Sequence, residues 1–232
     1  MQDYLNVRIR QDQLHANLGD GLPTGSLILV EGKDGAGKSI IAQRFSYSIL
    51  ESKKKVTYIT TELSTKDFID QMSSIKYYVD EHIINQNLLV IPMFPFMGGV
   101  KLRDDFIDRL MAAEQLFDSD FIVIDAFSFL LVQPNMTEGK SFDVINFFKK
   151  MTNKNRTILL TVDPEHLNAS LLTLLRSVSD IYLELGSKTL AGEERKFIRI
   201  NRFKKSRGTI SNQIAFRVDP GVGFIVEIAA LA

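Results

Sequence analysis

The chain has 232 residues, of which 45% are hydrophobic, and this length suits one α/β domain with a core of its own. Its 28 basic and 28 acidic residues balance, so no overall field favours a polyanion and we expect no nucleic acid partner. The lack of cysteine excludes disulfides, thiolate metal sites and thiol catalysis. No apolar run approaches the roughly 20 residues of a membrane span, and residues 1–20 carry no secretory segment. We therefore expect a cytoplasmic protein that does not insert into a membrane.

The first part of the chain predicts a lead-in over residues 1–25 and then a strong strand. The lead-in carries several glycine turn signals, and its leucines can pack against a sheet. Residues 26–31 follow with the run SLILVE, which is typical of a buried strand. This strand leads directly into a glycine-rich segment.

That segment reads GKDGAGKS, which fits the P-loop pattern of two glycines separated by four residues and followed by Lys and Ser. Backbone N–H groups must converge on phosphate oxygens there, so side chains at the glycines are excluded. Lys38 can reach the terminal phosphates, and the Ser39 hydroxyl can ligate Mg²⁺. The alternative is a loop that matches this pattern by chance. The predicted strand before it and the predicted helix after it disfavour that interpretation. The predicted nucleotide-binding residues of the loop are Gly32, Asp34, Gly35, Ala36, Gly37, Lys38, Ser39 and Ile40.

Strands and helices alternate after the loop. Helical periodicity or capping predicts helices over residues 38–52, 65–79, 102–117, 142–151 and 169–176. Apolar and β-branched runs predict strands over residues 56–61, 87–91, 121–125 and 157–162. After residue 180 the pattern changes to short strands over residues 181–185, 196–203, 213–218 and 224–228.

This order predicts an α/β fold: a doubly wound, mostly parallel sheet flanked by helices, with an antiparallel extension at its end. We expect residues 1–232 to form a single nucleotide-binding domain. Within it, residues 26–180 form the P-loop core and residues 181–232 form a β meander.

Asp125 ends a predicted buried strand, after four consecutive apolar residues. Carboxyl ends of parallel strands meet at one edge of a sheet, so this carboxylate should emerge beside the P-loop, where it can orient Mg²⁺ through water. The alternative is an aspartate that merely caps the next helix. The P-loop favours the Mg²⁺ role.

Glu62 follows the strand over residues 56–61 and should lie at the same edge. A carboxylate there can align, or accept a proton from, the water that attacks the γ-phosphate. The alternative is a glutamate near the start of a helix, stabilised by the helix dipole. We favour the water-positioning role, because strand placement and P-loop geometry agree.

A basic run, KKSRG, occupies residues 204–208 between two predicted strands. Such a run is usually a solvated hairpin. The sharper interpretation is a cationic finger, with Lys205 and Arg207 stabilising the γ-phosphate charge of a nucleotide held by an adjacent subunit. Spacing alone leaves these two interpretations open.

The ordered set of motifs resembles the RecA/KaiC-like P-loop ATPases. It comprises the LGDGLPTGS segment at residues 18–26, the P-loop, Glu62, Asp125 and the KSRG segment at residues 205–208. Within that superfamily, the acidic loop variant KDGA and the ending FRVDPG at residues 216–221 resemble FlaH (also called ArlH), the accessory protein family of the archaeal flagellum, or archaellum.

This resemblance implies a RecA-type core that binds ATP (or ADP) with Mg²⁺ and forms a hexameric ring with nucleotides at subunit interfaces. It implies docking at the cytoplasmic face of the membrane-bound motor with the ATPase FlaI, the membrane protein FlaJ and the scaffold protein FlaX. Lys205 and Arg207 match the Lys-x-Arg pair of KaiC-like proteins, which reaches a neighbour's γ-phosphate. By the same likeness, Val218, Asp219 and Pro220 lie near the base or ribose.

One departure concerns hydrolysis. KaiC-like enzymes usually carry two adjacent glutamates after the second strand, whereas this chain has Glu62-Leu63. General-base groups contribute about 10²- to 10⁴-fold in rate. We therefore expect ATP binding with slow or no turnover and regulation of FlaI. The alternative is an active KaiC- or RecA-like ATPase that serves signalling or DNA recombination.

Overall fold

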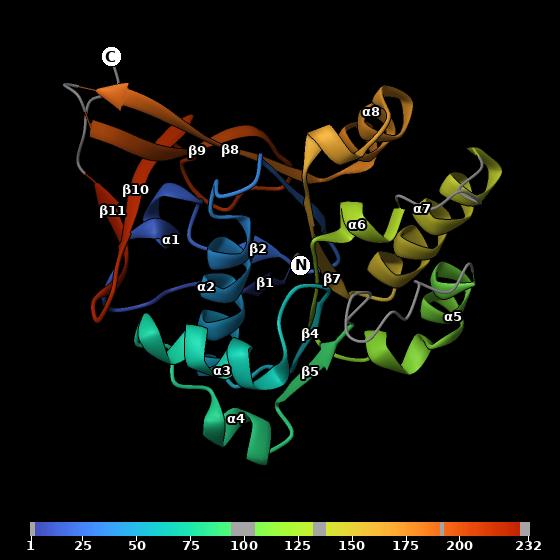
Figure 1. The fold of residues 1–232 in the computed structure, drawn as a ribbon, viewed down its shortest axis with the longest axis horizontal. Coiled ribbons are helices and arrows are strands. Elements are labelled where there is room, and N and C mark those ends of the chain that lie inside the picture. The colour runs from blue at the N-terminus through green and yellow to red at the C-terminus, as the bar shows by residue number, and fades with distance from the viewer. Residues whose placement is uncertain (1–2, 94–104, 132–137, 191–192, 228–232) are drawn as a thin grey trace.

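A computed structural model describes residues 3–93, 105–131, 138–190 and 193–227. It contains one large twisted sheet of nine strands, a small two-stranded sheet and helices on both faces of the large sheet (Figure 1). The predicted fold class is confirmed: a mostly parallel sheet is flanked by helices and continues into antiparallel strands near the end of the chain.

From edge to edge the large sheet has the order β11–β10–β9–β8–β3–β7–β6–β4–β5. The strands from β8 to β5 are parallel to one another, and β9, β10 and β11 continue the sheet in antiparallel fashion. Its strands are β3 (Leu27–Glu31), β4 (Val56–Thr60), β5 (Leu88–Pro92), β6 (Phe121–Asp125), β7 (Thr157–Val162), β8 (Ile181–Leu190), β9 (Glu193–Phe203), β10 (Gln213–Asp219) and β11 (Gly223–Glu227).

The central strands are buried on both faces, which explains their continuous apolar runs. Because side chains alternate along a strand, consecutive residues pack into two separate hydrophobic cores, one on each face of the sheet. Ile28 and Val30 pack on one face, and Leu27 and Leu29 pack on the other. The sheet therefore forms the middle layer between two helical layers.

The helices divide between these faces as Figure 1 shows, with α1, α2 and α3 on one side and α5, α6, α7 and α8 on the other. Their bounds are α1 (Leu14–Asn17), α2 (Lys38–Glu51), α3 (Thr65–Ser74), α4 (Asp80–Ile84), α5 (Phe106–Ala112), α6 (Phe127–Leu131), α7 (Glu138–Asn153) and α8 (Ala169–Val178), with short 3₁₀ turns at Glu114–Phe117 and Pro164–His166. In the part of the chain that is described, none of these helices has the length and apolar character needed to cross a bilayer.

Three predicted helices are wrong in extent. The helix predicted over residues 142–151 is α7, which runs from Glu138 to Asn153. The helix predicted over residues 65–79 ends at Ser74, because Lys76 adopts a left-handed φ of 65° that no helix continues through, and α4 begins only at Asp80. The helix predicted over residues 102–117 begins at Phe106 and gives way to the 3₁₀ turn at Glu114, while residues 102–104 lie outside the described ranges. The predicted short strands over residues 181–185 and 196–203 are parts of a longer β8–β9 hairpin.

The lead-in folds onto the helix that follows the P-loop. It forms β1 (Tyr4–Leu5), which pairs with β2 (Leu22–Pro23), and α1 between them. Asp12 and Arg44 are both fully buried and make two hydrogen bonds of 2.6 and 3.1 Å, and Arg44 also donates to the Val7 carbonyl at 2.6 Å. This ion pair anchors the first residues of the chain to α2.

Candidate functional site

The glycine-rich loop joins the carboxyl end of β3 to the first turn of α2. Gly35 and Gly37 have φ values of 72° and 99°, which only glycine adopts without strain. At Gly32 a Cβ would come within 3.0 Å of the Leu185 carbonyl oxygen, so the close approach of β8 also requires glycine. Gly37 is the N-cap of α2, so the positive end of that helix faces the loop. The local backbone is therefore built as an anion cradle.

Lys38 lies across its own loop. Its Nζ donates to the carbonyl oxygens of Gly32 and Lys33 at 2.8 and 2.9 Å, and Asp163 Oδ2 lies 3.9 Å away. The side chain is only 12% exposed. The ammonium group is thus held over the concave side of the cradle, where a terminal phosphate would replace neutral carbonyls as its partner.

A cleft of about 240 Å³ opens beside this loop at the carboxyl edge of the parallel strands. It is lined by Asp34, Gly35, Gly37, Lys38, Ser39, Ile40, Glu62, Asp125, Ala126, Thr161 and Lys196. A neighbouring cavity of about 660 Å³ shares Asp34, Gly35 and Lys196 with it, and Gly32 and Ala36 line that second cavity. The structure therefore brings the loop together with two carboxylates that come from separate strands.

Asp125 lines the cleft and is 1% exposed. Three donors fix its carboxylate: the Tyr58 hydroxyl at 2.8 Å, the Thr161 hydroxyl at 2.7 Å and the Ala126 N–H at 3.2 Å. Burial, and then the neighbouring Asp125, raises the pKa of Tyr58 well above its usual value, so its hydroxyl stays a donor. An orientation this firmly held suits a carboxylate that acts through water.

The donor set of the cleft fits Mg²⁺. The hydroxyl of Ser39 and the carboxylate of Asp125 are hard oxygen donors that line the same space as Lys38. Because Asp125 already accepts three hydrogen bonds, it fits a second-sphere place better than direct ligation. Ser39 and Asp125 would hold the ion together with the phosphates of a nucleotide.

Glu62 follows β4 and borders the cleft with an exposed side chain. Its N–H and that of Leu63 point to the Thr60 hydroxyl at 3.3 Å, which fixes the turn after the strand. Desolvation, together with the charge of Asp125, raises the pKa of the Glu62 carboxyl above its ordinary value, and Lys38 partly offsets the rise. Leu63 packs against the apolar core instead of adding a second carboxylate.

Lys205 and Arg207 lie near the amino ends of the parallel strands, at the end opposite to the P-loop. Lys204 donates its N–H to the Asp180 carbonyl at 3.0 Å, and Asp180 donates its own N–H to Leu27 at 2.8 Å. The turn is therefore level with the start of β3, whereas the P-loop follows its end. The length of β3 therefore separates this turn from the P-loop by about 13 Å or more. Neither side chain lines the cleft of its own chain.

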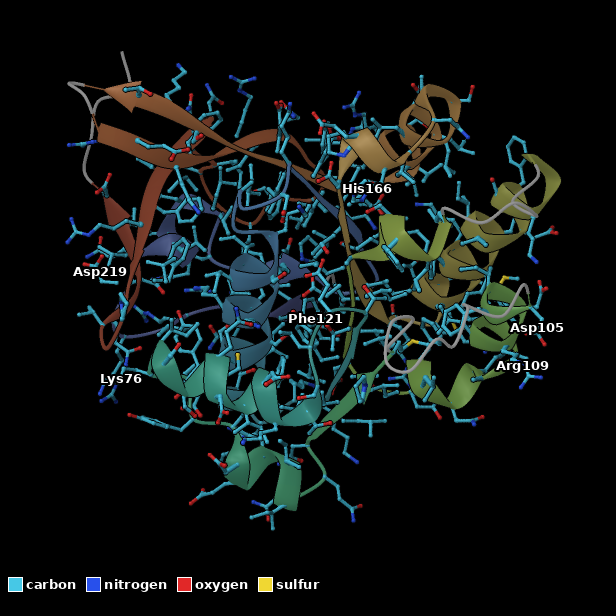
Figure 2. All side chains as sticks on the ribbon, in the orientation of Figure 1. Lys76, Asp105, Arg109, Phe121, His166 and Asp219 are labelled. Atoms are coloured by element: carbon cyan, nitrogen blue, oxygen red, sulfur yellow. The ribbon has the colours of Figure 1, made fainter. Side chains whose placement is uncertain are left out.

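Val218, Asp219 and Pro220 also lie outside the cleft. Asp219 pairs with Arg217 at 3.0 Å, and the Gly221 N–H donates to the Ser74 carbonyl at 2.9 Å. The turn after β10 thus contacts the end of α3. Figure 2 shows Asp219 on the outer side of the molecule, on the same side as Lys76 and well apart from His166.

Several residues of the cleft were not predicted. Lys196 of β9 donates its Nζ to the Gly35 carbonyl at 2.6 Å and lines both cavities. The Phe216 ring of β10 would lie 3.3 Å from a Cβ placed on Gly37. Thr161 and Tyr58 hold Asp125. No local pattern marks these residues, because pairing between distant strands brings them to the loop.

Similarity to known proteins covers almost the whole chain. The family model of the KaiC ATPase matches residues 9–226. The archaeal flagellar ATP-binding protein FlaH of Methanococcus voltae is 31% identical over 229 residues, 99% of both chains. FlaH of Methanocaldococcus jannaschii is 32% identical over 232 residues, which cover 100% of this chain and 99% of its own. The crystal structure of flagellar accessory protein FlaH from Methanocaldococcus jannaschii has a TM-score of 0.92 at 31% identity, covering 98% of this chain and 100% of that one.

Proposed function

Because this chain belongs to the KaiC-like ATPase family, and within it to the FlaH proteins of the archaeal flagellum, we propose that it binds Mg-ATP in the cleft at the carboxyl edge of its sheet. The observation that carries this proposal is the convergence of the P-loop, Glu62 and Asp125 on one cleft of about 240 Å³. These groups come from three different strand ends, and a loop that was merely rich in glycine would not need them.

The residues take distinct roles in this proposal. The N–H groups of the loop and the Lys38 ammonium bind the phosphates, and Mg²⁺ is held by Ser39 directly and by Asp125 through water. The metal neutralises phosphate charge when it is bound. The adjoining cavity of about 660 Å³ accepts the nucleoside. Val218, Asp219 and Pro220, which the resemblance places near the base or ribose, do not line this cavity, so they are left out of the proposed site.

Hydrolysis in this cleft is slow or absent. Glu62 lies where a water-positioning carboxylate is expected, but the adjacent Leu63 packs against the core and supplies no second carboxylate there. A single weak base lowers the rate of the chemical step without weakening the binding of phosphate. Such a site suits a nucleotide-dependent switch of assembly.

The assembly in this proposal is a hexameric ring of identical subunits with one nucleotide at each interface. Lys205 and Arg207 support this arrangement, because they lie at the sheet edge opposite to the P-loop and can approach only another subunit's nucleotide. The ring docks at the cytoplasmic face of the archaellum motor, where it regulates FlaI and contacts FlaJ and FlaX.

Titration calorimetry with Mg-ATP tests the binding proposal. Wild type is expected to bind, and Lys38→Ala is expected to weaken binding by about 100-fold, since a charge-assisted contact to phosphate is lost. Lys154→Ala is the matched control, because that exposed lysine lies beyond α7 and pairs with Glu114. No heat of binding in wild type, or equal heats in wild type and Lys38→Ala, would refute the site. Turnover of several ATP per second would favour the active ATPase instead.

A further inference from the structure

The turn that carries Lys205 and Arg207 is held by the first strand of the chain. The Tyr4 hydroxyl donates to the Lys205 carbonyl at 3.0 Å, across 201 positions of sequence. The Arg207 guanidinium carbon lies 5.5 Å from the centre of the Tyr4 ring. One side chain of β1 therefore contacts the backbone of one basic residue and the charged group of the other.

Further contacts fix the two flanks of this turn on the lead-in. Leu18 forms a β-bridge with Ile210, and the Ser211 N–H donates to the Asn17 carbonyl at 3.0 Å. Within the turn, the Ser206 hydroxyl donates to the Gly208 carbonyl. The backbone of residues 204–211 is thus already ordered, and Tyr4 is the side chain that determines where the guanidinium lies.

Lys204 pairs with Asp180 at 3.1 Å, whereas the charges of Lys205 and Arg207 have no such acidic partner among the described residues. In the described ranges, neither Lys205 nor Arg207 forms an ion pair, although both side chains are exposed. A carboxylate in the place of Tyr4 would orient Arg207 and also cancel its charge. An aromatic ring orients the guanidinium through its face and leaves the N–H donors at the guanidinium edge free for an anion.

We propose that Tyr4 is a positioning residue, which presents Lys205 and Arg207 to the γ-phosphate of the nucleotide bound by the neighbouring subunit. The inference rests on the proposed ring with nucleotides at its interfaces. Tyr4 itself does not touch the phosphate. Its ring and its hydroxyl hold the turn in the geometry that the phosphate requires, so that less order must be gained when two subunits meet.

The test is a double-mutant cycle on ATP-dependent assembly, read by sedimentation velocity at saturating Mg-ATP. Arg207→Ala and Tyr4→Leu are each expected to raise the protein concentration at half-assembly by about tenfold, and Tyr4→Phe by less, since it keeps the ring. In the Arg207→Ala background, Tyr4→Leu is expected to add much less than tenfold, since only the contact between its hydroxyl and Lys205 remains to be lost. Mg-ATP affinity of the dilute monomer and the melting temperature should stay unchanged. Tyr78→Leu, at an exposed tyrosine between α3 and α4, is the matched control.

The outcomes separate the two proposals. If Arg207→Ala leaves assembly unchanged, the proposed interface role of the turn fails. If Arg207→Ala weakens assembly but Tyr4→Leu does not, the positioning role of Tyr4 is wrong and the ring proposal stands. If Tyr4→Leu weakens assembly equally in both backgrounds, Tyr4 acts only on the stability of the fold and the inference is overturned.

Discussion

At the scale of single residues, the cleft contains two contrasting carboxylates: Asp125 ends β6, and Glu62 follows the neighbouring strand β4. Asp125 is buried and fixed by three hydrogen bonds, whereas Glu62 is exposed at the border of the cleft and fixed only through its backbone. The pKa of Glu62 is raised by desolvation and by Asp125. The two groups are therefore suited to different tasks, one to hold a cation and the other to exchange a proton.

Glu62→Gln tests this division. The variant is expected to bind Mg-ATP at least as tightly as wild type, since a negative charge near the phosphates is removed, and to lower residual hydrolysis by about 10²- to 10⁴-fold. In wild type, hydrolysis should fall as the pH is lowered through the raised pKa of Glu62, because the base becomes protonated, and Glu62→Gln should lack this acid limb. Single-turnover assays across pH provide the measurement.

Glu51→Gln is the control for that series, because Glu51 lies at the far end of α2, where it contacts His82. An acid limb that persists in Glu62→Gln would assign the proton transfer to another group. A loss of ATP binding in the same variant would instead place Glu62 among the binding residues.

At the scale of elements, α2 is shared between the nucleotide site and the lead-in. Its first turn follows the P-loop, and its Arg44 pairs with Asp12 in the core. A buried pair of this kind adds little net stability over apolar packing, yet loss of one partner leaves an unpaired charge in the interior. The orientation of α2 and the fold of the lead-in are thus coupled.

Asp12→Asn removes the charge and keeps the shape. We expect the free energy of unfolding to fall by about 3–5 kcal/mol, measured by urea denaturation. Glu114→Gln is the matched control, since Glu114 forms its ion pairs with Lys150 and Lys154 at the surface. We expect the control to leave the urea midpoint unchanged. Equal midpoints for Asp12→Asn and wild type would show that Arg44 finds another partner.

At the scale of the whole molecule, the proposed nucleotide cleft and the basic turn lie at opposite ends of the parallel strands. The cleft is at their carboxyl ends, and the turn at residues 204–208 is level with their amino ends. No subunit can complete its own site under the proposed function, because the P-loop follows the strands and the turn at residues 204–208 lies where they begin. The repeating unit of such an assembly is one subunit's cleft with the next subunit's turn. A ring closes this pattern without leaving an unpaired edge.

Mixing of two defective variants tests this arrangement. Lys38→Ala lacks a working cleft and Arg207→Ala lacks a working turn, so at a protein concentration just sufficient for wild type neither is expected to assemble with Mg-ATP alone. An equimolar mixture should form complexes, because one subunit supplies Lys38 and the other supplies Arg207 at every second interface. Mass photometry with and without Mg-ATP measures the effect. A mixture that stays monomeric, with both proteins folded, would contradict the shared site.

The sequence alone was sufficient to predict the central parallel strands and the position of the cleft at their carboxyl ends. The apolar runs of β3, β6 and β7 predicted buried parallel strands, and their common edge predicted that Asp125 and Glu62 meet the loop. These inferences succeeded because they depend on local runs and on one rule of sheet geometry. The chemical roles of the site residues stay predictions.

The remainder depends on contacts between distant segments. Lys196 reaches Gly35 across 161 positions, and Tyr4 reaches Lys205 across 201. No periodicity announces such pairs, since each is created by the packing of a whole hairpin or strand. The break between α3 and α4 was missed for a different reason: a lysine with a left-handed backbone conformation carries no compositional signal.

Strand β9 meets the cleft near one end and the finger at the other. Lys196 bonds to the P-loop, and the strand then runs to Phe203, about 23 Å further on, directly before the turn. In a closed ring, β9 of each subunit would connect that subunit's cleft, through the basic turn, to the cleft of the neighbouring subunit. A phosphate that displaces Lys196 from Gly35 would then strain the following pocket, and cooperative loading, with a Hill coefficient above one, is the expected signature.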